Sequence, residues 1–150
     1  MSRAKPKPLL LKNLLAVTVA SAGSPLFRNL WYRIDGKDID VLRDGDLSCA
    51  FYVSSILKLF SLIGDIHTTV IKTEEDMQTH GWRKIKQPRP GAVVVWAPKT
   101  FPKSGEIHKH IGIYLGNGDV VSNSSKRRVP NKHDWQYRPV ETIYAHPKLK

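Results

Sequence analysis

The chain has 150 residues, of which 41% are hydrophobic and 25% are charged, and this composition indicates one globular domain with its own core. A single cysteine excludes an internal disulfide and any zinc site built from several thiolates. The formal net charge of +11 favours anionic partners, such as an anionic polymer, nucleic acid or an acidic membrane.

We expect a single domain over residues 9–144, between a flexible basic N-terminus (1–8) and a basic C-terminal tail (145–150). The first residues resemble a secretion signal, but Lys12 and Asn13 interrupt the apolar run, so a domain helix is preferred over a signal peptide. No run is long enough to span a bilayer. The lone thiol favours a cytoplasmic location over secretion, although an exported thiol protein needs a free cysteine as well.

The first half of the chain shows helical and turn patterns. The helix that begins at Cys49 has the clearest pattern, because its apolar residues recur at helical spacing. The other helices of this half are predicted from capping residues and from a proline at a helix start, and the turn is predicted from Asp-Gly pairs. Helices are predicted over 9–22, 26–31, 49–63 and 73–80, and a turn or short hairpin over 32–46.

The second half changes to the period of strands. A proline-bounded apolar run, a pair of strands around a Gly-Asn-Gly turn, and an apolar segment near the end are each typical of a sheet. Residues 124–135 are predicted to be a solvated basic loop. Because helices precede strands, we predict an α+β fold, with N-terminal helices packed on an antiparallel sheet. The strands are expected within 88–98, 108–125 and 141–146.

Cys49 is the candidate nucleophile, because it lies where the clearest helix begins. Ser48 is expected to cap that helix, and the unpaired backbone N–H groups of its first turn stabilise a thiolate. This position predicts a lowered pKa for the Cys49 thiol. A buried structural thiol is the alternative interpretation.

A thiolate nucleophile needs a base, and His110 opens the strand HIGIYLG. Strand alternation places His110 and Gly112 on one face, and the small Gly112 leaves room for the helix end that carries Cys49. A third residue should orient the imidazole. Asn123 is preferred, because its amide oxygen can accept from the ring N–H, and the adjacent Ser122 is the other candidate.

Three motifs, in this order, resemble the NlpC-type cysteine peptidases, a family of small papain-like cell-wall hydrolases. They are LSCAFYV at the nucleophile helix, PRPGAVVVW at the following strand and HIGIYLGNG at the histidine strand. The resemblance implies a papain-like fold, with Cys49 as nucleophile, His110 as general base and the Cys49 backbone N–H as an oxyanion donor. It also implies thioester chemistry on an amide bond, without a metal or organic cofactor.

The chain departs from the family at three positions, and at one of them Ala92 replaces the Asp after Pro-Gly. Ser48 replaces the Asp before the cysteine, and direct spacing puts Ser122 where the family has a third histidine. If Ser122 occupies that position, the triad is weak, or His133 or Asp134 supplies the third group. A β-bulge after the glycine turn would instead bring Asn123 into line.

Four residues are candidates for contact with the substrate. The family places a tyrosine near the sulfur, and the His-x-His pair at 108–110 lies at the cleft edge, with zinc binding as a weaker alternative. A tryptophan is a candidate for the wall of a groove. The four residues are Tyr32, Ser48, His108 and Trp135.

These patterns predict a cysteine peptidase or amidase that acts as a monomer on a peptide. It would cut an amide or isopeptide bond, and the peptidoglycan stem peptides of bacterial cell walls are the first candidate substrate. The alternative is a non-catalytic module on the same fold, whose basic surface binds nucleic acid or another polyanion.

Overall fold

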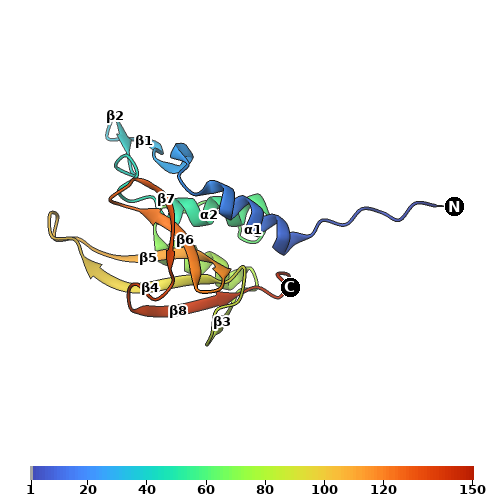
Figure 1. Ribbon diagram of the computed structural model, residues 1–150. Helices are drawn as coiled ribbons and strands as arrows, with labels where there is room; N and C mark the ends of the chain where they lie inside the picture. Colours follow the sequence, from blue (N-terminus) through green and yellow to red (C-terminus); the bar gives the residue numbers. More distant parts are fainter. Residues whose placement is uncertain (1) are drawn as a thin grey trace.

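In the computed structural model, which describes residues 2–150, helices come first along the chain and the main sheet follows (Figure 1). A two-stranded antiparallel ribbon separates the first helix from the second. The elements of the first half are α1 (Leu10–Ser21), the 3-10 turn η1 (Pro25–Phe27), β1 (Trp31–Ile34), β2 (Lys37–Asp40), α2 (Cys49–Leu59) and α3 (Val70–Thr79).

The second half forms one six-stranded sheet in the order β3-β8-β4-β5-β6-β7, and every neighbouring pair is antiparallel. The predicted α+β class, with N-terminal helices packed on an antiparallel sheet, is therefore confirmed. The strands are β3 (Arg83–Ile85), β4 (Val93–Thr100), β5 (Ile107–Gly116), β6 (Asp119–Ser124), β7 (Val129–Asp134) and β8 (Val140–Ala145).

The core lies on both faces of this sheet. Helix α2 packs on β5 and β6, and α1 lies beside α2 (Figure 1). The apolar stripe of α2, which includes Val53 and Leu57, joins Ile111 and Ile113 of β5 in the larger cluster. The opposite face of the sheet carries a smaller cluster around Trp96. The α2 face of the sheet therefore anchors the helix that begins at Cys49.

The predicted helix over 49–63 ends at Leu59. Ser61 adopts a left-handed backbone with φ of +56°, which stops the helix, and yet Leu62 and Ile63 remain buried. The apolar pattern thus continues into the core after the helical backbone has ended. A hydrophobic period reports burial, and it does not fix where the hydrogen-bonded helix stops.

Two other helices also differ from their predicted bounds. The helix predicted over 73–80 begins at Val70, because the Thr69 side chain accepts a hydrogen bond from the N–H of the third helical residue. The helix predicted over 26–31 is a single 3-10 turn that ends at Phe27, and Trp31 is the first residue of β1 instead.

Two strands have no counterpart in the prediction. Strand β3 has only three residues, and β7 lies within the segment 124–135 that is predicted to be a solvated basic loop. Strand β7 pairs with β6 along its whole length. Strand β7 is important for the site, because it carries His133.

The two ends of the chain differ. Residues 2–8 are exposed and form neither helix nor strand, whereas the segment expected as a C-terminal tail is packed. The Nε2–H of His146 donates to the carbonyl of His80 at 2.8 Å, and Leu149 is buried in the main core. Within residues 2–150, no helix has both the length and the apolar character needed to cross a membrane.

Candidate active site

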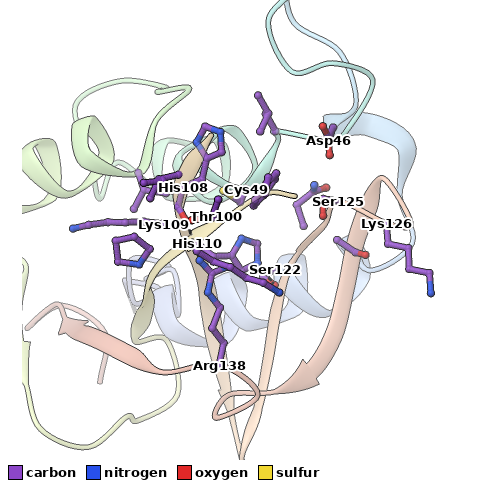
Figure 2. A pocket seen from close by; sticks show the side chains of 18 of the residues that line it. Asp46, Cys49, Thr100, His108, Lys109, His110, Ser122, Ser125, Lys126 and Arg138 are labelled. Atoms are coloured by element: carbon purple, nitrogen blue, oxygen red, sulfur yellow. Dashed lines mark hydrogen bonds between the residues drawn. The ribbon is translucent and has the colours of Figure 1, made fainter. Parts of the chain in front are cut away.

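Side chains from both halves of the chain line one cleft of about 1300 Å³, which Figure 2 shows from close by. The loop before α2, the start of α2 and the start of α3 meet parts of β4, β5, β6 and β7 there. The connection from β7 to β8 completes the lining. Of the predicted site residues, the cleft brings together Cys49, His108, His110, Ser122 and Asn123.

Cys49 is the first residue of α2 and lies at the cleft, as predicted. Ser48 does not act as its cap: within residues 2–150, the Ser48 side chain makes no capping hydrogen bond, and its Oγ is buried without a partner. Because Ser48 is fully buried, it does not contact a substrate either. The start of α2 therefore has no side-chain cap from Ser48.

The predicted lowering of the Cys49 pKa is wrong for the free protein. Burial raises the pKa of the Cys49 thiol to about 11, although the backbone N–H groups of Ala50, Ile111 and Cys49 and the charge of Arg138 act in the opposite direction. The helix end does stabilise the thiolate, as expected, but loss of water outweighs it. At neutral pH the resting sulfur is a thiol, and it needs a base.

His110 is held tightly on one face of the sheet. Its ring stacks on Trp96, with ring centroids 5.2 Å apart, and its Nε2 lies 2.9 Å from the Ser122 hydroxyl. Burial lowers the pKa of His110 to about 3, and the nearby charge of Arg138 adds to this effect. The ring is therefore neutral at ordinary pH and can accept a proton.

The space beside Gly112 is not filled by the Cys49 helix. A Cβ at Gly112 would lie 2.9 Å from both Trp96 and Ser122, so these side chains occupy the room that the glycine leaves. Helix α2 packs on the opposite face instead. Cys49 approaches the strand at the residue after His110, because the backbone N–H of Ile111 acts on its sulfur.

The strand register decides between Ser122 and Asn123. Gly112 pairs with Ser122, which puts Ser122 on the same face as His110. Asn123 points to the other face, where its Nδ2 donates to the Gly45 carbonyl at 2.8 Å. A register irregularity does occur before the turn, but it leaves Ser122 in line. Asn123 therefore anchors the loop before α2 and does not orient His110.

Ser122 links His110 to a second imidazole. His133 donates from Nδ1 to the Asp134 carbonyl at 2.9 Å, and burial lowers the pKa of His133, so its Nε2 is an acceptor. Nε2 then accepts the Ser122 hydroxyl proton at 2.5 Å. Ser122 in turn accepts from Nε2–H of His110, which assigns the free lone pair of His110 to Nδ1. Ser122 and His133, two alternatives that the sequence leaves open, are thus hydrogen-bonded in series to His110.

Two further residues of the cleft have no signal in the sequence. Tyr137 packs edge-on against His133, with ring centroids 4.4 Å apart, and against Trp96 at 5.3 Å. Arg138 donates from Nε and Nη2 to the Ala97 carbonyl and from Nη2 to the His108 carbonyl. Both residues follow β7 in an irregular connection, so only the three-dimensional path of the chain brings them to the cleft.

Among the four predicted substrate contacts, only His108 lines the cleft. Its Nε2 lies 3.2 Å from Glu106. Tyr32 is half exposed on the β1–β2 ribbon, away from the cleft lining. Trp135 borders a smaller pocket near β3 and β8, and its carbonyl accepts a hydrogen bond from Trp96. Within residues 2–150, no group of three or more ligand side chains is arranged to hold a metal ion.

No protein-family model and no curated protein matches the sequence. The fold is similar to the solved structure of NlpC2 from Trichomonas vaginalis, with a TM-score of 0.53 and 18% identity over 93% of this chain and 47% of that one. NlpC1 from the same organism gives a TM-score of 0.52 and 18% identity, over 95% and 47%. The chain thus spans about half the length of these structures, and the NlpC-type fold predicted from the sequence motifs is confirmed.

Proposed function

We propose that the protein is a thiol hydrolase, a cysteine peptidase or amidase, that cuts an amide or isopeptide bond. Cys49 is the nucleophile and His110 is the general base. The observation that carries this proposal is the hydrogen-bond chain from His110 through Ser122 to His133, in the cleft that also holds Cys49. This chain fixes the tautomer whose Nδ1 can receive the thiol proton.

The chemistry follows from two groups that are neutral at rest. Nδ1 of His110 takes the proton of Cys49 as the sulfur attacks the carbonyl carbon of the scissile amide. The Cys49 backbone N–H, at the open start of α2, is a donor for the oxyanion that forms. His110 then gives the proton to the leaving amine, and water hydrolyses the resulting thioester.

Ser122 and His133 support the charged state of His110. When Nδ1 gains a proton, the hydrogen bond from Nε2–H to Ser122 becomes charge-assisted and therefore stronger. His133 holds the Ser122 hydroxyl in the accepting orientation. The stacked Trp96 ring keeps the imidazole plane fixed. These contacts offset part of the cost of charging a buried imidazole.

The first substrate to test is a peptidoglycan stem peptide. This choice rests on the fold alone, since the same fold can carry different activities. A basic module without catalysis remains the second candidate, because the net charge is +11 and the resting Cys49 is a thiol of raised pKa. It would bind a random oligonucleotide with an affinity that falls steeply with salt.

The direct test is turnover of purified stem peptides and cross-linked fragments, followed by mass spectrometry, with wild-type protein and Cys49→Ala. We expect cleavage by the wild type, loss of cleavage in the variant, and an acyl adduct on Cys49 in rapidly quenched samples. Cleavage that persists in Cys49→Ala would refute the assignment. Absence of cleavage in both proteins, together with salt-dependent oligonucleotide binding, would favour the non-catalytic module.

A further inference from the structure

Positive charge dominates the lining of the cleft around Cys49. The lining contains one carboxylate, Asp46, and several lysine and arginine side chains from different elements. These cations belong to the loop before α2, to the β4–β5 hairpin that reaches out from the sheet (Figure 1), to the β6–β7 turn and to the β7–β8 connection. They are Arg43, Lys99, Lys103, Lys109, Lys126 and Arg138.

Some of these cations are neutralised within the protein. Arg43 pairs with Glu106 at 2.6 Å, and Lys109 pairs with Glu74 at 3.2 Å and with Glu141 at 2.7 Å. The others face no carboxylate within 4 Å among residues 2–150. Three of them are exposed at the rim of the cleft, and these are Lys99, Lys103 and Lys126.

Arg138 is an unpaired cation that lines the same cleft as Cys49 and His110. Its Nε and Nη2 are fixed on the carbonyls of Ala97 and His108 at 2.6 to 3.0 Å, and none of these three hydrogen bonds uses Nη1. Its charge lowers the pKa of both Cys49 and His110. A half-buried guanidinium in a fixed orientation is suited to a carboxylate.

The geometry points to a specificity rule: the cleft selects substrates that carry a carboxylate beside the scissile amide, and Arg138 binds that carboxylate. Lys99, Lys103 and Lys126 attract further carboxylates of the same chain at the rim. This inference rests on the proposed function for the position of the scissile bond. The recognition itself is a property of binding, and it can be measured without turnover.

The test uses two acetylated, amidated alanine pentapeptides that differ only in a central Glu or Gln, titrated calorimetrically into Cys49→Ala protein at low salt. We expect the Glu peptide to bind about tenfold or more tightly than the Gln peptide, as a charge-assisted hydrogen bond predicts. The preference should vanish in Cys49→Ala with Arg138→Gln. The ratio of the two affinities should fall severalfold with Lys99→Gln and Lys126→Gln together, and it should also fall with added salt.

The matched control is Lys84→Gln together with Lys86→Gln. These two lysines border the smaller pocket, and replacing them removes the same charge as Lys99→Gln with Lys126→Gln. This control should keep the full preference. Because Arg138 also holds two carbonyls, Arg138→Lys provides a second variant, which keeps the charge and should keep part of the preference.

Equal binding of both peptides would overturn the inference. A preference for the Glu peptide that survives Arg138→Gln would also overturn it. The same holds if the Lys84 and Lys86 control loses this preference as fully as Arg138→Gln does. Turnover of neutral amides by the wild type would leave the proposed function standing in each of these cases. Conversely, a Glu preference that depends on Arg138, without any turnover by the wild type, would support this inference while the hydrolase proposal fails.

Discussion

The imidazole of His110 is enclosed from two directions. Trp96 stacks on its ring, and Ser122 receives the hydrogen bond from its Nε2. Burial lowers the pKa of this ring to about 3 and raises the pKa of the Cys49 thiol to about 11, so both groups are neutral over a wide range of pH. In the proposed mechanism, His110 would hold a proton taken from the sulfur only weakly, and it would therefore pass that proton readily to the leaving amine.

Replacing Ser122 by alanine removes the acceptor of the His110 Nε2–H and separates His110 from His133. We expect kcat to fall by roughly 10- to 100-fold with a small change in KM, since the ring loses its fixed tautomer. The measurement is steady-state hydrolysis of the substrate that the wild type cleaves. Ser125→Ala is the matched control at the cleft wall, and its kcat should not change. An unchanged kcat in Ser122→Ala would refute the role given to this chain of contacts.

Elements with an apolar period are those that the sequence predicts well. Helix α2 and the β5–β6 hairpin are examples, and they place Cys49 and His110. Strand β7 is an edge strand of mixed polar sequence, so its only signal is its pairing with β6. Without β7, the contact between Ser122 and His133 cannot be derived. The Arg138 side chain is missed for a related reason, because the irregular connection that carries it follows β7.

Gly45 lies in the loop before α2, where this loop comes close to the β6–β7 turn, and replacing Gly45 by alanine tests this close approach. Its φ is +88°, and a Cβ would lie 2.6 Å from the Arg128 carbonyl oxygen. Gly36→Ala is the matched control, because its φ of +75° imposes the same backbone strain in open space. We expect Gly36→Ala to lower the free energy of unfolding by about 1 kcal/mol, from strain alone.

Gly45→Ala should lower it by at least about 1 kcal/mol more, because the backbone of Arg128 must shift. Chemical denaturation of both variants measures the difference. Equal losses in the two variants would mean that the loop and the turn are farther apart than described.

At the scale of the whole molecule, the C-terminus closes the fold over α1. A Cβ placed on Gly91, just before β4, would lie within 4 Å of Leu11, Leu14 and Leu149, so both ends of the domain meet there. The sequence predicts a basic tail over 145–150, because Leu149 stands between two lysines and forms no apolar pattern with its neighbours. In the structure, Leu149 nevertheless packs into the core. Short segments of this kind give no period, and their burial depends on where the rest of the chain leaves space.

Leu149→Ala should therefore destabilise the domain by about 2 to 4 kcal/mol, as expected for a buried leucine. Leu149 is 3% exposed, whereas Leu59 at the end of α2 is 65% exposed. Leu59→Ala is the matched control and should change stability by less than about 0.5 kcal/mol. Denaturant titration followed by tryptophan fluorescence gives both values. If both variants lose less than about 0.5 kcal/mol of stability, Leu149 does not belong to the packed core.

The most direct test of the account is the protonation state of His110, followed by nuclear magnetic resonance on protein labelled with nitrogen-15 in histidine. His110→Gln assigns the signals. We predict a neutral ring with the proton on Nε2 at pH 7, which stays neutral as the pH falls toward about 3, because burial disfavours the charged form. A ring with its proton on Nδ1, or an imidazolium at pH 7, would contradict the assignment of His110 Nδ1 as the base for Cys49.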